Sequence, residues 1–187
     1  PISNCKLSSG ICDVTKLRKN GINIGLGTDG IGSTTTMDMF EEMKTASLLA
    51  KFSNLDAAAL DAWSVCQMAT TTGAKALGMQ HEIGSLEVGK QADLIAVKLD
   101  TPRMTPLIDQ GRLFNVHTNL VHAVQGQDVL MTMVAGQVVV ENGCLVHADL
   151  QALIDQVNQA APRLFQRRDQ WFAKQEKVVN ELQREKS

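Results

Sequence analysis

The stretch Asn23-Ile-Gly-Leu-Gly-Thr-Asp-Gly-Ile-Gly-Ser33 decides how this chain is interpreted. It continues a short apolar run, Ile22–Leu26, which predicts a buried strand. A glycine-rich turn follows and carries a single carboxylate, Asp29. A helix is expected to begin around Asp38. Barrel enzymes place catalytic groups in this way, at the C-terminal end of a strand that leads into a helix.

Two simpler interpretations of this stretch remain open. One is that Asp29 is a turn residue that hydrogen-bonds neighbouring amides. The other is nucleotide binding, because Gly25-Leu-Gly-Thr-Asp-Gly30 matches the G-x-G-x-x-G fingerprint. That fingerprint opens a helix directly, whereas Ile31–Thr36 intervene here, and Asp29 would place a negative charge beside the phosphates. No strand ending in Asp or Glu follows about 20 residues later, so nucleotide binding is the weaker interpretation.

The composition excludes several classes of protein. The chain has 187 residues, 44% of them hydrophobic, and a net charge of −2, which gives no electrostatic case for nucleic acid or an anionic membrane. No apolar run reaches the roughly 18 residues of a transmembrane helix, and no signal peptide is present. The cysteines are widely spaced without a C-x-x-C motif, which favours reduced thiols in a cytoplasmic protein over disulfides or a cysteine zinc site. They are Cys5, Cys12, Cys66 and Cys144.

The first 80 residues contain four helical patterns. A short helix is expected over Val14–Asn20, ended by Asn20-Gly21. The next helix is expected to be capped by Thr36 or Asp38, and its apolar residues recur at the spacing of one helix face. A third starts at Leu55-Asp56, and a short one follows over Gly73–Leu77. The expected face of the second is Phe40, Met43, Ser47 and Ala50, and that of the third is Leu60, Trp63, Cys66 and Ala69.

The pattern of apolar and turn residues changes after residue 80. Short apolar runs alternate with turn residues over 83–147, and Asn142-Gly143 is a strong hairpin signal, so this part is expected to be β-rich. Val121–Val124 and Val129–Val134 are two of the expected strands. The tail is helical and charged, with an apolar stripe, and Pro162 should kink it or begin a new helix. We therefore predict three parts: 1–80, 81–148 and 149–187.

Other candidate chemical groups are weak. The histidines form neither H-x-H nor H-E-x-x-H, and no serine stands in G-x-S-x-G. His117 and His122 are five residues apart at an expected loop-to-strand junction, where metal binding is a minor alternative to ordinary structural roles. Asp93 follows Gly89-Lys90 at the entrance to a strand and is best explained by turn chemistry.

Several motifs in a fixed order resemble the C-terminal part of the amidohydrolase superfamily, most closely its methylthioadenosine/S-adenosylhomocysteine deaminases and related chlorohydrolases. The resemblance extends to about Gly143 and is specific because the motifs occur jointly. The motifs are Pro1-Ile-Ser-Asn-Cys-Lys-Leu-Ser-Ser-Gly10, Gly25-Leu-Gly-Thr-Asp-Gly30, Asp38-Met-Phe-Glu-Glu-Met43, Gly73-Ala-Lys-Ala-Leu-Gly78 and Ile83-Gly-Ser-Leu-Glu-Val-Gly-Lys-Gln-Ala-Asp-Leu-Ile95.

The resemblance implies an α/β fold: the C-terminal portion of a metal-dependent (β/α)8 barrel, part of a small β-sandwich, and a C-terminal helix. Asp29 would be the aspartate at the end of the last barrel strand, which in the family contacts one divalent metal, usually zinc, and takes a proton from the metal-bound water. The hydroxide then attacks a ring carbon that bears an amino group or a halide. Pro1–Gly10 would follow the seventh strand, and Asn4 would brace that face.

The resemblance also indicates what is missing. The family's H-x-H pair and its further histidines would lie upstream of Pro1, and one carboxylate cannot make a zinc site. Because the chain starts at Pro1, in a loop-like stretch without Met, we expect a fragment that is inactive alone. Its expected partners are the missing N-terminal portion, a small-molecule substrate and further copies in a homo-oligomer.

Three functions are weighed on this basis. The first is hydrolytic deamination of an amino-substituted purine-type or similar N-heterocycle by the parent enzyme. The second is a chlorohydrolase or guanine-type deaminase of the same superfamily, since most substrate-reading loops would lie upstream. The third is a non-catalytic interaction module made of the β-rich part and the tail. An H-x-H motif on an early strand of the parent would favour the enzyme.

Overall fold

The computed structural model describes the backbone of residues 1–184 and the side chains of residues 1–176. It divides into two compact units, Pro1–Gly143 and Cys144–Ser187, and each is described by itself. Residues 185–187 of the predicted tail, with its Lys186, lie outside the described residues, as do the side chains of Lys177 and Arg184. The predicted boundaries at 80/81 and 148/149 remain a prediction.

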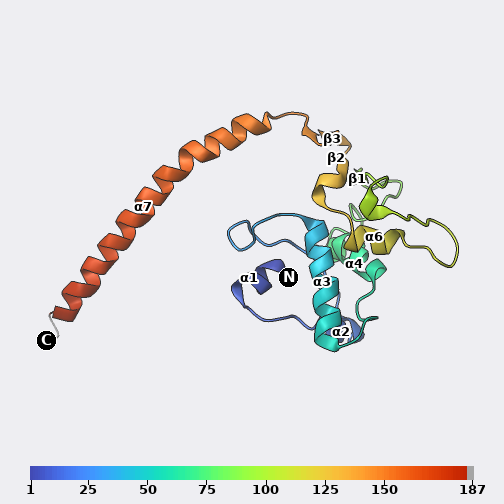
Figure 1. The fold of residues 1–187 in the computed structure, drawn as a ribbon, viewed down its shortest axis with the longest axis horizontal. Helices are drawn as coiled ribbons and strands as arrows, with labels where there is room; N and C mark the ends of the chain where they lie inside the picture. The colour runs from blue at the N-terminus through green and yellow to red at the C-terminus, as the bar shows by residue number, and fades with distance from the viewer. Residues whose placement is uncertain (185–187) are drawn as a thin grey trace. The chain divides into compact units, whose positions relative to one another are not determined.

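The first unit combines short helices with an antiparallel sheet (Figure 1). Its α-helices are α1 (Ile2–Leu7), α2 (Val14–Lys19), α3 (Met39–Asn54), α4 (Ala62–Ala69), α5 (Thr71–Ala76) and α6 (Val116–His122). Its 3-10 turns are η1 (Pro102–Met104) and η2 (Gly126–Asp128), and its strands are β1 (Leu94–Val97), β2 (Val129–Val134) and β3 (Gln137–Glu141). The mixture of helix and sheet agrees with the expected α/β class.

The hydrophobic core lies where α3, α4 and α6 pack on one another. The predicted face of α3 is confirmed, since Phe40, Met43, Ser47 and Ala50 are all buried. Their spacing of three or four residues places them on one side of the helix. Of the two predicted caps, Thr36 and Asp38, it is Asp38 that caps α3. Its carboxylate accepts the Phe40 N–H at 2.8 Å.

The sheet of the first unit runs in the order β1-β2-β3, and neighbouring strands are antiparallel. Leu94 pairs with Met133 and Met131 pairs with Glu141, and each pair of strands contains one register irregularity. The predicted strand Val129–Val134 is confirmed. Asn142 and Gly143 have φ values of 50° and 75°, the left-handed conformation that a type I′ turn requires, so the predicted turn is confirmed as well.

Two predicted strands are wrong. Ile22–Leu26 is extended but pairs with no strand among the described residues, and half of the Ile22 surface is exposed. A strand of this apolar kind needs strand neighbours along both edges. Its described backbone partners are instead the Leu17 and Met68 carbonyls, which accept the Ile22 and Leu26 N–H groups at 3.1 and 3.0 Å, and the Thr72 hydroxyl. Val121 belongs to helix α6 and Val124 lies just past its end; both are buried in the helical core, so tertiary packing overrides their strand propensity.

The predicted helix starts also need correction. No helix begins at Leu55-Asp56, because Leu55 is the left-handed C-cap of α3. Helix α4 begins at Ala62 with Asp61 as its N-cap, and this register leaves Trp63 half exposed. Ile2–Leu7 forms a helix, although Pro1–Gly10 was expected to be a loop.

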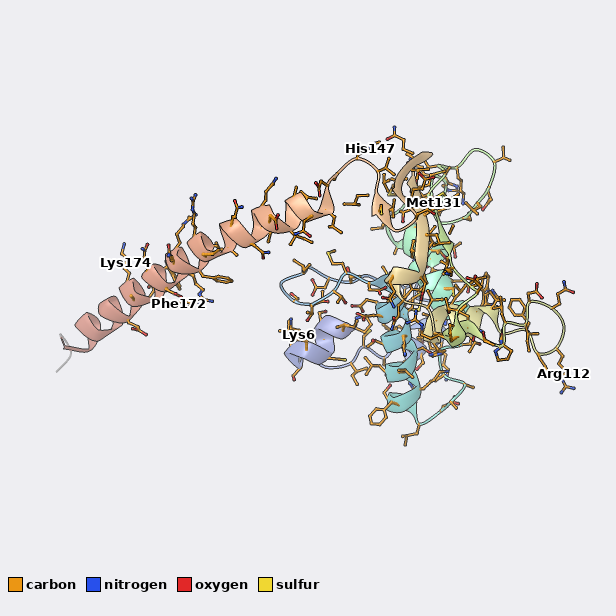
Figure 2. The ribbon with its side chains drawn as sticks, turned by 45° about the horizontal axis from the view of Figure 1, so that its top comes forward. Lys6, Arg112, Met131, His147, Phe172 and Lys174 are labelled. Atoms are coloured by element: carbon orange, nitrogen blue, oxygen red, sulfur yellow. The ribbon has the colours of Figure 1, made fainter. Side chains whose placement is uncertain are left out.

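The second unit consists of the short strand β4 (Cys144–Leu145) and helix α7 (Leu150–Arg184). The helix continues through Pro162, so no new helix begins there. Phe172 and Lys174 project from α7 in different directions (Figure 2). No described helix has both the length and the apolar composition needed to cross a membrane. The apolar side chains that α7 exposes are Leu150, Leu153, Ile154, Val157, Leu164, Phe165, Trp171 and Phe172.

Candidate functional site

The extended segment that leads to Asp29 is held against the α4–α5 joint. The Thr72 hydroxyl donates to the Ile24 carbonyl at 2.9 Å, and the Asn23 side chain donates to the Thr72 carbonyl at 2.9 Å. A Cβ on Gly25 would lie only 3.1 Å from the Gly73 Cα, so the two backbones approach closely enough to require glycine. The joint therefore fixes the direction in which the segment reaches Asp29.

Asp29 itself is exposed and has a φ of 63°, a left-handed conformation that non-glycine residues rarely adopt. Its Oδ1 accepts the Gly30 N–H at 2.6 Å, which supports the turn interpretation for one oxygen. Its Oδ2 accepts no hydrogen bond from the described part of the chain. One carboxylate oxygen is thus available for a water, a substrate or a metal ion. The catalytic and metal-binding roles of Asp29 remain predictions.

The nucleotide interpretation of Gly25–Gly30 is contradicted by the structure. The fingerprint needs a helix that starts at Gly30, but a turn follows instead, in which the Gly30 carbonyl accepts the Ser33 and Thr34 N–H groups at 2.9 and 3.1 Å. Helix α3 begins only at Met39. The glycine turn therefore does not open helix α3 directly.

A hollow of about 230 Å³ lies between the first residues of the chain and the segment that carries Asp29. Asn4 lines it from α1, and Gly27 lines it two residues before Asp29. The structure therefore brings the Pro1–Gly10 segment beside the Asp29 segment, as expected for a shared face. Whether Asn4 braces that face in the parent remains a prediction.

The histidines do not assemble a metal site. His117 and His122 lie on helix α6 and not at the predicted loop-to-strand junction. The His117 ring stacks between Trp63 at 4.5 Å and Phe114 at 5.0 Å between centroids. Burial, and then the nearby Lys51 and Lys44, lower the pKa of His122. Among the described residues, no three His, Cys, Asp or Glu side chains stand close enough to hold a metal ion.

The described residues therefore show no complete zinc site. Asp29 offers an oxygen of a kind that zinc accepts, but a protein zinc site takes at least three protein ligands. The four cysteines are free thiols, and none of them stands in a group of three potential ligands among the described residues. Burial, followed by the charge of Asp61, raises the pKa of the half-buried Cys66.

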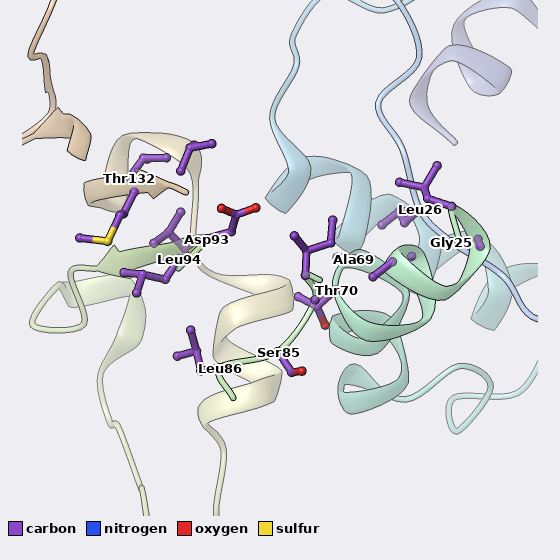
Figure 3. Close-up of a pocket in the computed structure, with 18 residues that line it drawn as sticks. Gly25, Leu26, Ala69, Thr70, Ser85, Leu86, Asp93, Leu94 and Thr132 are labelled. Atoms are coloured by element: carbon purple, nitrogen blue, oxygen red, sulfur yellow. The ribbon is translucent and has the colours of Figure 1, made fainter. Parts of the chain in front are cut away.

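A second hollow, of about 770 Å³, lies away from Asp29 (Figure 3). Figure 3 shows Leu26 and Ala69 on one side and Leu94 and Thr132 of the sheet on the other. Asp93 is its ionisable residue, and the Asp93 Oδ1 accepts the Ala135 N–H at 2.7 Å. This bond reaches the turn between β2 and β3, so the local turn role of Asp93 stays a prediction, and the apolar walls offer little for catalysis.

One buried acid was missed by the sequence analysis. Glu42 is 1% exposed; its Oε2 accepts the Ile2 N–H at 3.2 Å, while its Oε1 has no hydrogen-bond partner among the described residues. Glu41 and Glu42 both lie in the first turn of α3, where the helix dipole favours acids. The signal was available, because Glu42 falls on the buried stripe between Met39 and Ala46.

With this geometry in place, comparison with known proteins defines the class of the chain. A sequence model of the amidohydrolase family matches residues 1–139. This match covers most of the chain, and the chain belongs to the amidohydrolase family. The resemblance drawn from its motifs is confirmed.

Particular relatives are deaminases. The chain is 44% identical over 167 residues to a 5'-deoxyadenosine deaminase of Methanosarcina acetivorans and 38% identical over 167 residues to a 5-methylthioadenosine/S-adenosylhomocysteine deaminase of Thermoanaerobacter pseudethanolicus. Each match covers 89% of this chain and 37% of the relative. The solved structure of an adenosine deaminase from Xanthomonas campestris with bound zinc is 38% identical, with a TM-score of 0.82, over 89% of this chain and 36% of that one. The chain thus spans little more than a third of its relatives.

Proposed function

We propose that this chain is the C-terminal part of a metal-dependent aminohydrolase that deaminates an adenosine-type nucleoside. The observation that carries the proposal is Asp29, whose carboxylate is exposed at the end of a fixed segment with one oxygen unengaged. Membership of the amidohydrolase family and the names of the similar deaminases supply the reaction class.

In the proposed reaction, Asp29 accepts the proton of the water that attacks the amino-bearing ring carbon. A carboxylate is suited to this role because it is ionised at neutral pH and can later return the proton to the leaving amine. The backbone at Asp29 is left-handed, a strained conformation of the kind found at functional sites. General-base catalysis of this kind contributes about 10²–10⁴-fold to a rate.

The proposed cofactor is one divalent metal ion, of which zinc is the best candidate. Asp29 would supply one ligand, and the others would come from parts of the relatives that this chain does not span. The zinc in the similar adenosine deaminase structure supports this assignment. When bound, such an ion lowers the pKa of a coordinated water.

The proposed partner is the remainder of the parent protein, in a (β/α)8 barrel and β-sandwich. The unpaired Ile22–Leu26 segment and the apolar hollow beside Leu94 and Thr132 support this, since both expose surfaces that protein interiors normally cover. We also propose a cytoplasmic homo-oligomer, which agrees with the free thiols. Light scattering tests assembly: a soluble, cooperatively melting monomer of the isolated chain would favour the interaction-module alternative.

The experiment that tests the function uses the parent protein at the full length of its relatives. Purified parent with zinc is mixed with 5'-deoxyadenosine, methylthioadenosine, S-adenosylhomocysteine, guanine or a chlorotriazine, and ammonia and chloride are measured. We expect ammonia from the adenosine-type compounds. Ammonia from guanine alone, or chloride release, would replace the proposal with the second function. No turnover of any of them would favour a non-catalytic module.

A further inference from the structure

Asp38 makes two hydrogen bonds that lead to distant parts of the first unit. Its Oδ1 accepts the Phe40 N–H at 2.8 Å and so caps helix α3. Its Oδ2 accepts the Gly126 N–H at 2.7 Å, across 88 residues of sequence. Gly126 begins η2, the turn that enters strand β2. The Asp38 carboxylate therefore links the start of α3, which follows the Asp29 turn, to η2, which precedes strand β2.

The η2 side of this contact is itself firmly held. Asp128 is buried, accepts the Gln125 N–H at 2.9 Å, and pairs with Arg103 through both carboxylate oxygens at 2.7 Å. Both bonds come from one guanidinium nitrogen of Arg103, while its other terminal nitrogen donates to the Gln125 side chain, so charge-assisted hydrogen bonds hold this turn. A Cβ on Gly126 would stand 2.9 Å from the Asp38 Oδ2, so any larger residue there must displace Asp38.

The loop between Asp29 and Asp38 is equally well ordered by its own contacts. Thr34 is 1% exposed; its hydroxyl donates to the Thr36 carbonyl at 2.5 Å and accepts the Thr36 N–H at 3.2 Å. The Thr36 hydroxyl donates to Glu41 on α3 at 2.5 Å. With the Gly30 turn at its start, these contacts connect the loop to α3 at several points, and this is the route by which a shift at Asp38 would reach Asp29.

We infer that Asp38 is a positioning residue for Asp29, and that Asp38, Gly126, Asp128 and Arg103 form a bracket that fixes the far end of the Asp29 loop. A strained backbone such as that of Asp29 persists only where its surroundings hold it. The inference rests on the proposed function for its effect on turnover. On this inference, η2 helps to position Asp29 from the start of strand β2, although no side chain of η2 belongs to the candidate site.

Two substitutions test the bracket from opposite sides in the full-length parent. Asp38→Ser keeps a good N-cap for α3, but the shorter hydroxyl cannot also reach Gly126. Gly126→Ala keeps the Asp38 side chain but forces its carboxylate to shift, and the φ of Gly126 lies outside the left-handed range that would strain alanine. Each should lower kcat by about tenfold, the value of one hydrogen bond to a charged group, with KM changed less than about twofold.

The double variant is the decisive measurement for a shared contact. If both substitutions break one link, the double variant should be no slower than the slower single variant, because effects on a shared interaction do not add. Losses that multiply, or single variants with unchanged kcat, would overturn the inference. Asp13→Ser is the matched control, since Asp13 caps α2 through contacts with Thr15 and Lys16 only.

A second readout does not depend on turnover. Hydrogen exchange of the amides of residues 30–36 should be faster in Asp38→Ser and Gly126→Ala than in the unaltered parent, and unchanged in Asp13→Ser. Equal exchange in all four proteins would overturn the inference even if activity fell. If the unaltered parent deaminates nothing, the proposed function fails alone, and the exchange rates still decide whether the bracket holds the loop.

Discussion

The helical layer of α3, α4 and α6 and the extended segment Ile22–Leu26 are both apolar, but they differ in how complete they are. In the helical layer, Val65 and Val121 are 0% exposed, and all of their neighbours come from this chain. In the extended segment, Ile22 is 50% exposed, and Leu26 has a single backbone bond to Met68. The first region is closed by its own residues, whereas the second presents surfaces that the chain does not cover.

The difference matters because the candidate catalytic residue lies on the incomplete region. Asp29 follows the extended segment, which Thr72 of α5 holds on one side, and Asp38 at the start of α3 stands at the other end of its loop. Under the proposed function, this chain therefore supplies the support for Asp29 and only a share of the site. The following predictions test that division.

The largest effect is expected on isolating the chain. Residues 1–187 alone should deaminate none of the substrates named above and should bind zinc no better than a generic surface site, because Asp29 is the single candidate ligand on the site face. The measurement is zinc content after dialysis against a weak chelator. Stoichiometric zinc would contradict this prediction and would make His117 and His122 the next candidate ligands.

The next largest effect is expected from Asp29→Asn in the parent. The substitution keeps the shape of the side chain but removes the proton acceptor, so turnover should fall by about 10²–10⁴-fold. Metal content should fall less than activity, because the other ligands would hold most of the ion. Steady-state rates and metal analysis on one preparation check both points, with Asp13→Asn as the control. Near-normal turnover would reduce Asp29 to a turn residue.

A smaller effect is expected on the unfolding free energy, where substitutions in the helical layer and in the Ile22–Leu26 segment should differ. Met43→Ala in the isolated chain removes a buried side chain from α3 and should cost about 2–5 kcal/mol of unfolding free energy. Ile22→Ala should change it by less than about 0.5 kcal/mol in the isolated chain, since Ile22 is half exposed there. Urea unfolding measures both. In the parent, Ile22→Ala should become more costly, and equal costs in the two proteins would contradict the division.

The smallest effect concerns His122, which lies where α6 meets α3. Burial and the nearby Lys51 and Lys44 lower its folded-state pKa, so the unfolded chain binds the proton first. Its contribution to stability is therefore complete above about pH 6.5 and is lost as the pH falls through that value toward the folded-state pKa. His122→Gln should melt with less pH dependence between pH 7.5 and 5. The exposed His147 gives the control, His147→Gln, and identical pH profiles for both variants would refute the effect.

The parts of the fold that sequence predicted well depend on local signals. Phe40, Met43, Ser47 and Ala50 repeat at helical spacing, and Asp38 is a good N-cap, so this helix needed no tertiary information. The apolar run Val121–Val124 was too short to distinguish strand from helix, and packing decided it. Ile22–Leu26 was recognised as extended, but its strand pairing depends on neighbours that this chain does not contain.

The candidate site was predicted to a different extent. Asp29 was identified by the order of motifs around it, since a lone carboxylate in a glycine turn is not specific. The bond between Asp38 and Gly126 joins residues 88 positions apart, and no local pattern announces such a contact. Glu42 was overlooked because two adjacent acids suggest a solvated helix start, although their spacing puts only one of them on the buried stripe.

The uneven burial of the four thiols makes the chain its own reporter of unfolding. Thiolates, and not thiols, react with alkylating reagents, so the half-buried Cys66, with its raised pKa, is slow to react in the folded chain. Cys5, Cys12 and Cys144 are exposed and take up label early. A mass increase from three labels to four therefore times the opening of helix α4 without any engineered probe.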